Sequence, residues 1–208
     1  PPSMDYGFND LKDPNAYNPE RSKQLLAEDG WKDTDGDGIL DKDGKPLTFD
    51  FVVYNSRAEL PLYAEAVQAD LKKVGIDMKI KTVDYNLIDK MGQDGDYDML
   101  ISNIVTANTG DPIWFLANYW HTNDNGSNPQ NGSGYSNPQV DQLLDAAETE
   151  FDPAKRRDYA IQIQQLLMND GAALFLGYPK TNIVTGSYLK GAVMYPSDYY
   201  WITNKITK

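Results

Sequence analysis

The feature that most constrains the fold is a strand–helix–strand pattern between residues 46 and 85. Residues 46–54 (PLTFDFVVY) and 76–85 (IDMKIKTVDY) are rich in β-branched and aromatic residues in near alternation, which predicts two strands. Residues 59–74 between them predict a helix, because apolar residues recur at helical spacing and Gly75 follows. Its apolar side is expected from Leu62, Ala66, Val67, Ala69 and Leu71. A connection of this length predicts a right-handed βαβ unit with parallel strands.

Other elements are predicted on both sides of this unit. Three helices begin with a capping residue followed by proline, at Asn18–Pro19, Asn137–Pro138 and Asp152–Pro153. The first of them ends at Gly30, and Leu25 and Leu26 are expected to supply its buried face.

More strands are expected after the βαβ unit. Following a short helix over residues 86–91, residues 97–105 (YDMLISNIV) predict a buried strand, and the runs ALFLGY and NIVTG after Ala172 predict further strands. The whole pattern predicts an α/β fold with a mixed, partly parallel sheet flanked by helices.

Composition excludes several classes of function. The net charge of −12 argues against nucleic-acid binding, because the phosphate backbone would be repelled. The absence of cysteine excludes zinc-finger, disulfide, iron–sulfur and thiol-nucleophile sites. No apolar run approaches the roughly 20 residues of a membrane span. The chain also lacks GxSxG, HExxH and glycine-rich phosphate motifs, so we expect no enzymatic activity.

Residues 33–46 (DTDGDGILDKDGKP) form an acidic turn that resembles a calcium-binding loop. Aspartates occupy relative positions 1, 3, 5 and 9 of the calcium-loop pattern: Asp33, Asp35, Asp37 and Asp41. Gly38 occupies position 6, and Ile39 occupies position 7, where the backbone carbonyl is the metal ligand. Position 12, which is a bidentate Glu in an EF-hand, is Gly44 here. Two interpretations therefore stay open: a weak structural calcium site, or a metal-free Asp/Gly turn held by side-chain-to-backbone hydrogen bonds.

The single histidine, His121, ends an aromatic segment. Residues 111–121 (DPIWFLANYWH) predict a helix capped by Asp111 with Pro112 at its first position, which places His121 at the helix C-terminus, where the helix dipole favours imidazolium. Aromatic side chains at helical spacing are usually core, so these residues alone favour a structural or surface role. A ligand-binding role for His121 remains the alternative.

Several stretches, taken in order, resemble the extracytoplasmic solute-binding proteins of ABC importers for peptides and nickel, family 5. They are YNPERSKQLLAEDGWKDTDGDGILDKDGKPLTF, AEAVQADLKKVGIDMKI, YDMLISN, GDP, GYSNPQVDQLLDAA and the ALFLGYP run. The resemblance implies a periplasmic-binding-protein-like lobe: residues 1–208 would form the C-terminal ligand-binding lobe of a two-lobed protein, with about 172–208 returning toward an N-terminal lobe. The opening PPSMDYGF is consistent with a cut inside such a longer protein.

The resemblance also implies site residues. Where peptide-binding members hold the ligand's ammonium group with an Asp shortly before the DP step, this chain has Asn108, whose neutral amide gives a weaker hydrogen bond. Nickel-binding members resemble the chain around the DP step itself, with a histidine ten residues after the Asp of that step. Asp111 and His121 have this spacing, so His121 would coordinate nickel held in a small chelator. Arg57 would pair with a chelator carboxylate, and Trp114, Tyr119 and Trp120 would wall the ligand.

The resemblance therefore implies a substrate-binding component that captures a nickel chelate or a small peptide and delivers it to membrane permease subunits. We expect a monomer that needs no cofactor, with nickel as cargo and calcium at most structural. Its location would be periplasmic, or on the cell surface as a lipoprotein in the full-length form. The alternatives are a secreted calcium-stabilised interaction module with no transport role, and a hydrolase that uses a carboxylate pair, for which no motif gives specific support.

Overall fold

The computed structural model describes residues 1–106, 110–180, 182–194 and 203–208. The chain divides into two compact units, residues 2–174 and residues 175–208 with Pro1, and each is described by itself. In the described part of the chain no helix combines the length and the hydropathy of a membrane span.

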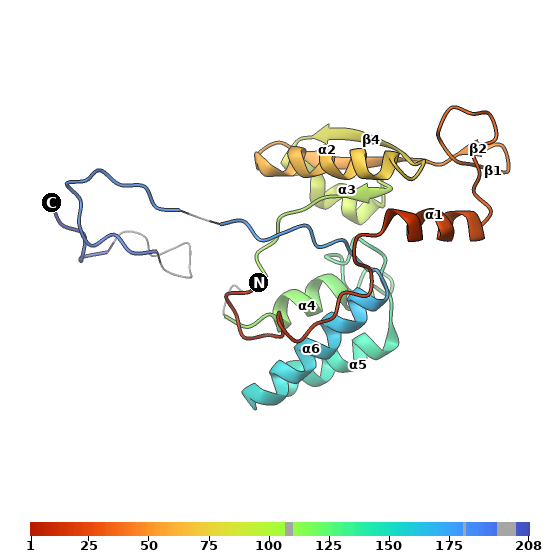
Figure 1. Cartoon of the computed structure of the whole chain (residues 1–208). Coiled ribbons are helices and arrows are strands. Elements are labelled where there is room, and N and C mark those ends of the chain that lie inside the picture. The colour runs from red at the N-terminus through yellow and green to blue at the C-terminus, as the bar shows by residue number, and fades with distance from the viewer. Residues whose placement is uncertain (107–109, 181, 195–202) are drawn as a thin grey trace. The chain divides into compact units, whose positions relative to one another are not determined.

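A three-stranded parallel sheet forms one part of the larger unit (Figure 1). Its central strand, β3 (Thr48–Tyr54), pairs with β4 (Asp77–Val83) on one side and with β5 (Met99–Leu100) on the other. Helix α2 (Glu59–Lys72) connects β3 to β4 and packs against both strands. The predicted parallel βαβ unit and the α/β class are therefore confirmed.

The buried stripe of α2 differs in part from the predicted one. Leu60 and Ala64 are buried, and the predicted Val67 and Leu71 are half-buried on the same side, whereas Leu62, Ala66 and Ala69 are exposed. The helix carries two apolar stripes, and the sheet covers the one that includes Leu60 and Ala64. A helical period by itself does not say which of two stripes a neighbouring element will cover.

Helix α1 (Pro19–Glu28) and a small hairpin precede the sheet in sequence. The Asn18 side chain accepts a hydrogen bond from the Arg21 amide, which confirms the predicted cap. The prediction that Leu25 is buried is wrong, since its side chain is exposed and none of the residues of α1 is fully buried. Strands β1 (Asp41–Lys42) and β2 (Lys45–Pro46) form a separate antiparallel pair, so the main sheet itself is parallel throughout.

The chain between β4 and β5 forms the short helices η1 (Tyr85–Leu87) and α3 (Ile88–Asp94). The strand predicted over residues 97–105 is reduced to β5, Met99–Leu100. One further amide, that of Ile101, donates to the Val52 carbonyl at 3.0 Å before the chain leaves the sheet.

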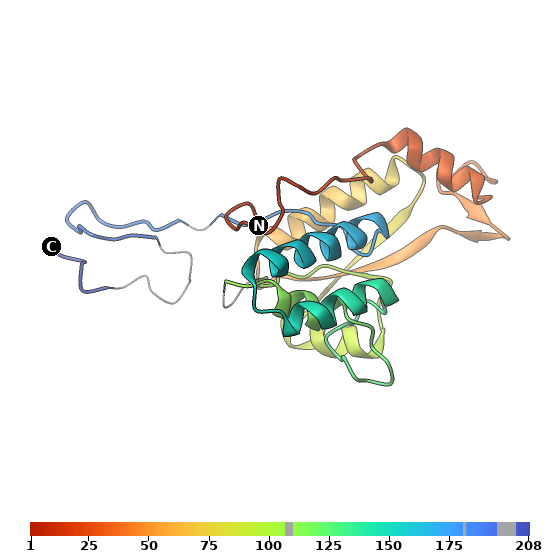
Figure 2. The same cartoon turned by 90° about the horizontal axis from the view of Figure 1, so that it is seen from below.

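The second part of the larger unit is helical and contains α4 (Ile113–Trp120), α5 (Pro138–Thr149) and α6 (Pro153–Asn169), as Figure 2 shows from below. Asn137 and Asp152 cap α5 and α6, as predicted. The three helices enclose one apolar core, to which each contributes buried side chains: Ile113, Leu116, Ala117, Trp120, Val140, Leu144, Ala147, Ala160, Ile163 and Leu167.

The described residues from Ala172 onward contain no strand, so the strands predicted for ALFLGY and NIVTG are absent. This part of the described chain contains an isolated antiparallel bridge between Lys190 and Thr207, with backbone hydrogen bonds of 2.8 and 3.0 Å. A strand needs a hydrogen-bonded neighbour, and apolar composition alone does not supply one.

Candidate ligand-binding site

The carboxyl ends of the three parallel strands meet at one edge of the sheet, where ligands of open α/β sheets usually bind. At this edge β3 ends at Tyr54 and β4 at Val83. The residues that follow the strands are polar or aromatic, and several of them contact one another across the edge.

Tyr54 joins two of these connections. Its ring is buried, and its hydroxyl oxygen accepts a hydrogen bond from the Asn103 amide at 3.0 Å. The Asn103 side chain donates to Glu59, in the first turn of α2, at 3.3 Å. The Tyr54 ring also meets Tyr85 edge-on, with centroids 5.1 Å apart, and Tyr85 is 55% exposed. The edge therefore presents the exposed ring of Tyr85, which packs against the buried ring of Tyr54.

Arg57 lies in the loop between β3 and α2, at the same edge. Its carbonyl accepts the Leu60 amide at 3.2 Å, and its side chain is exposed. Within the described residues its guanidinium has no hydrogen-bond or ion-pair partner. A free guanidinium is available to pair with a carboxylate.

Helix α4 places the predicted aromatic residues in different environments. Trp114 is 52% exposed, whereas Trp120 is only 8% exposed and packs edge-on against Tyr135 inside the helical core, with centroids 5.9 Å apart. Tyr119 packs on Phe115 at 5.2 Å. Burial raises the pKa of Tyr119, and the Asp89 carboxylate raises it further.

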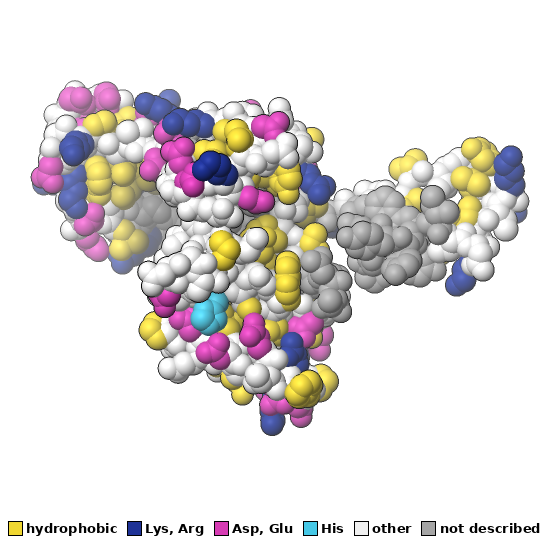
Figure 3. Space-filling view, turned by 180° about the vertical axis from the view of Figure 1, so that it is seen from behind, with side chains coloured by type: hydrophobic (Ala, Val, Ile, Leu, Met, Phe, Trp, Pro, Cys, Tyr) yellow, Lys and Arg dark blue, Asp and Glu magenta, His cyan; other side chains and the backbone are white. Residues whose placement is uncertain are grey.

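His121 ends α4 and turns toward α5. Its Nε2 lies 3.3 Å from Asp145 Oδ1, and its Nδ1 lies 3.6 Å from Asp141 Oδ1 and 3.3 Å from the Thr122 carbonyl oxygen. Burial lowers the pKa of His121, but the Thr122 carbonyl and the two carboxylates outweigh it, so the pKa is raised overall. Figure 3 shows the imidazole at the surface with acidic side chains beside it.

The imidazole borders a pocket of about 270 Å³, whose other lining residues are Ala117, Asn118, Ser127, Asn128 and Glu148. Two side chains of the following loop hold the backbone of His121. The side-chain amides of Asn128 and Asn131 donate to the His121 carbonyl at 2.7 and 2.9 Å. Asn131 is buried, and its side chain also donates to the Tyr135 carbonyl at 2.8 Å.

The residues predicted for the ligand do not form one cluster. Arg57 lies at the carboxyl edge, Trp114 and Tyr119 lie on α4, Trp120 is core, and His121 contacts α5. Asn108 lies outside the described residues.

Asp111 and Arg156 form the connection between α4 and the other two helices. Pro112 occupies the cap position that had been predicted for Asp111, and Asp111 Oδ1 accepts the Ile113 amide at 2.8 Å. Asp111 Oδ2 accepts two hydrogen bonds from the Arg156 guanidinium, at 2.9 and 2.6 Å. Both oxygens of this carboxylate are therefore occupied.

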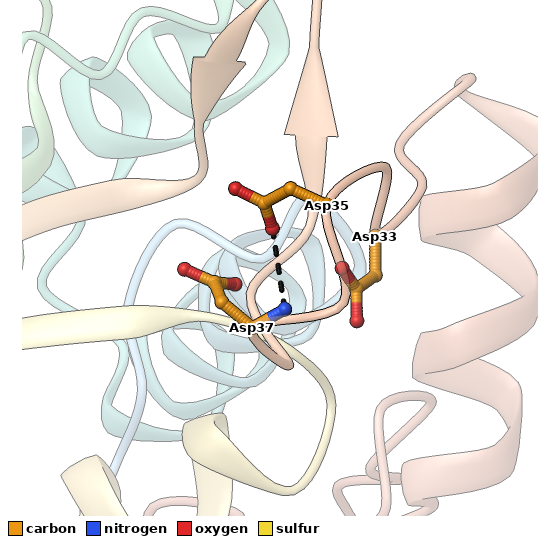
Figure 4. A group of neighbouring side chains, drawn as sticks. All are labelled: Asp33, Asp35 and Asp37. Carbon is orange, nitrogen blue, oxygen red and sulfur yellow. Dashed lines mark hydrogen bonds between the residues drawn. The ribbon is translucent and has the colours of Figure 1, made fainter.

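The acidic turn brings three of its predicted metal ligands together (Figure 4). Carboxylate oxygens of Asp33, Asp35 and Asp37 lie within 4.8 Å of one another, and all three side chains are exposed. Asp41 instead accepts hydrogen bonds from the Thr34 amide and hydroxyl, at 3.1 and 2.9 Å.

The same aspartates also hold the backbone of the turn. Asp33 accepts the amides of Gly36 and Gly38 at 2.7 and 3.1 Å, and Asp37 accepts the Ile39 amide at 2.7 Å. The oxygen donors suit calcium in kind, but the bidentate carboxylate of a calcium loop has no counterpart at Gly44.

Sequence reasoning missed four residues of the carboxyl edge: Tyr54, Glu59, Tyr85 and Asn103. A signal for three of them was present, because Tyr54 ends one predicted strand and Tyr85 and Asn103 lie close to the ends of the other two. The rule that ligands bind beyond the carboxyl ends of parallel strands points to these positions.

Comparison with known proteins gives consistent matches. The family model "Bacterial extracellular solute-binding proteins, family 5 Middle" matches residues 1–127. Oligopeptide-binding protein AppA of Bacillus subtilis is 32% identical over 187 residues, which is 86% of this chain and 33% of AppA. Nickel-binding protein NikA of Staphylococcus aureus is 26% identical over 206 residues, or 96% of this chain and 39% of NikA.

Solved structures agree with these matches. AppA in complex with a nonapeptide superposes with a TM-score of 0.68 at 30% identity, over 79% of this chain and 32% of AppA. A nickel ABC transporter protein from Bacillus halodurans gives a TM-score of 0.74 over 99% of this chain and 42% of that protein, and at 23% identity it supports the fold alone. The chain spans about a third of the length of the curated relatives that it matches.

Proposed function

Since this chain belongs to the family 5 bacterial extracellular solute-binding proteins, we propose that it is the C-terminal lobe of the substrate-capturing component of an ABC importer. Members of this family are extracellular or periplasmic binding proteins rather than enzymes. The proposed cargo is a small peptide or a nickel chelate, and the proposed recipient is a membrane permease. The family match favours this function over the calcium-stabilised interaction module.

The observation that carries the proposal is the composition of the carboxyl edge. It combines the Arg57 guanidinium, which has no partner among the described residues, with the exposed ring of Tyr85. Ligand sites are typically apolar surfaces with a few polar groups that fix orientation. A carboxylate on the ligand would pair with Arg57, and aromatic rings would contact its apolar part.

The mechanism is binding without chemistry. We propose that a second lobe closes over the ligand by hinge motion and that the closed form is presented to the permease as a monomer. Closure is favoured because the ligand gains contacts with both lobes only in the closed state. The present lobe alone would accordingly bind weakly.

The choice between the two cargoes depends on His121. Its side chain is 37% exposed and reaches a pocket, as a ligand to a chelated metal must. Coordination would require the neutral imidazole and would displace its contact with Asp145, whereas the raised pKa favours the protonated form. His121 is therefore the residue to test.

The test is calorimetric titration of the full-length gene product and its His121→Ala and Arg57→Gln variants. One ligand is nickel with excess free histidine, and the other is a mixed pool of small peptides. Binding of either ligand that Arg57→Gln weakens about tenfold, or 1.4 kcal/mol, supports the carboxyl edge as the site. Nickel–histidine binding that His121→Ala weakens to the same degree makes His121 a ligand.

The control is Arg21→Gln, which removes an exposed arginine of α1 that pairs with Glu28. It should leave affinity unchanged. Absence of binding by the wild-type protein to both ligands would contradict the proposed cargo classes.

A further inference from the structure

Arg156 of α6 connects three segments of the helical part. Its Nε and Nη2 donate to Asp111 Oδ2, just before α4, at 2.9 and 2.6 Å. Its Nη1 donates to the carbonyls of Ala147, in α5, and of Glu150, at the end of α5, the latter at 2.8 Å. The guanidinium thus caps the end of one helix and holds the beginning of another.

The partner carboxylate is committed to this contact. Asp111 is 29% exposed and Arg156 is 21% exposed, so the pair is largely removed from solvent. The second oxygen of Asp111 accepts the Ile113 amide at 2.8 Å, in the first turn of α4. In the sequence Asp111 is the only acidic residue between Asp98 and Asp124.

Helix α4 carries two of the aromatic residues proposed for the ligand. Trp114 lies in its first turn and is exposed, and Tyr119 lies in its last turn, where it packs on Phe115. The direction in which α4 starts therefore affects the surface that a ligand meets. Charge-assisted hydrogen bonds are stronger than neutral ones, and partial burial strengthens them further, so the Arg156–Asp111 contact can fix the direction of the first turn of α4.

We infer that Arg156 is a positioning residue for ligand binding, which acts through Asp111 by fixing the first turn of α4. The inference rests on the proposed function, because it assigns Arg156 a role in the affinity of that same site. Among the described residues its hydrogen bonds go to Asp111, Ala147 and Glu150, none of which is a proposed ligand contact. Its effect is preorganisation: a binding surface that is already ordered loses less freedom when the ligand arrives.

The neighbouring arginine offers a matched control. Arg157 follows Arg156 on α6 and also pairs with carboxylates, those of Asp5 at 3.1 Å and Asp10 at 2.7 Å. Both of its partners lie in the N-terminal segment. Arg157→Gln therefore removes the same charge and a comparable set of ion pairs from the same helix without releasing Asp111.

The first experiment measures hydrogen exchange of the Ile113 amide by NMR in the wild-type chain and in the Arg156→Gln and Arg157→Gln variants. We expect Arg156→Gln to increase the exchange rate about tenfold or more, because Asp111 is no longer held, and Arg157→Gln to leave it unchanged. Arg156→Lys, which keeps the charge but not the set of hydrogen bonds, replaces Arg156→Gln if the latter does not fold. Equal exchange in all variants would overturn the inference.

The second experiment measures affinity for trialanine, and separately for nickel with excess free histidine, in the full-length gene product below the unfolding range of every variant. Arg156→Gln and Asp111→Asn should each weaken binding by at least about fivefold, and the double variant should be no weaker than either single one. A merely structural role would lower the unfolding temperature and leave affinity at the wild-type value, and that result would refute the inference. If the wild-type protein binds neither probe, the proposed cargo fails, and the Ile113 exchange decides whether Arg156 positions α4.

Discussion

The contact between His121 and α5 predicts a pH dependence of stability. At low pH the imidazolium faces two carboxylates, Asp145 at 3.3 Å and Asp141 at 3.6 Å, which tie the end of α4 to α5. Deprotonation removes the charge and leaves neutral hydrogen bonds. We therefore compare the unfolding temperatures of the wild-type chain and the His121→Gln variant at pH 5 and at pH 8.5.

The sign follows from the direction of the pKa shift. Burial alone would lower the pKa of His121, but the Thr122 carbonyl and the two carboxylates raise it above the ordinary value of 6.5. A group with a raised folded-state pKa contributes stability that is fully present below its unfolded pKa and is lost as pH rises through the folded pKa. The advantage of wild type over His121→Gln must therefore be larger at pH 5 than at pH 8.5.

The magnitude is limited by exposure. The His121 side chain is 37% exposed and that of Asp145 is 71% exposed, so water and salt screen the attraction. Exposed ion pairs contribute about 0.2–1 kcal/mol each, and we expect about 1 kcal/mol for the two together. In a chain of this size that difference corresponds to a shift of about 2–4 °C in the unfolding temperature.

Thermal unfolding followed by circular dichroism at the two pH values, for both proteins, measures this quantity. The N-terminal ammonium also titrates in this range, so the difference between wild type and variant is the relevant value. Asp145→Asn is the control and should remove part of the same pH dependence. A difference between wild type and His121→Gln that stays constant, or grows, from pH 5 to pH 8.5 would refute the reasoning.

Two other predictions concern the acidic turn and a crowded glycine. If the turn binds calcium, added calcium should raise the unfolding temperature and Asp35→Asn should abolish that rise in a calcium-titrated melt; an unchanged melt would make the turn metal-free. Gly75→Ala should destabilise the chain by about 2–4 kcal/mol in urea unfolding, because Gly75 has a φ of +83° and an added Cβ would lie 2.7 Å from Leu40 Cγ. Gly44→Ala, where φ is +73° and the Cβ would meet open space, should cost only the backbone part, about 1–2 kcal/mol. Equal losses at the two glycines would contradict the proposed clash.

Much of the fold and little of the site could be read from the sequence. Arg57 was identified through a resemblance, and the structure places it at the carboxyl edge, where its guanidinium has no partner among the described residues. Tyr54 and Asn103 were not predicted as site residues, although they connect the ends of two strands that the sequence predicts. Their hydrogen bond spans 49 positions in the chain, and no local pattern reports a contact between residues so far apart.

The sequence by itself determined the features that depend on neighbouring residues. Asn18, Asn137 and Asp152 cap their helices because each side chain reaches an amide two or three positions later. The alternation of residues 46–54 and 76–85 similarly specified two strands, and the helix between them specified that they are parallel.

Tertiary structure decided what depends on a distant partner. The sheet selected the Leu60 stripe of α2 over the Leu62 stripe, and the helical core took up Trp120 while Trp114 stayed exposed. His121 met Asp145, 24 positions away, and Asp111 met Arg156, 45 positions away. The physical reason is the same in each case: burial and ion pairing are properties of two surfaces together, and a sequence pattern describes only one of them.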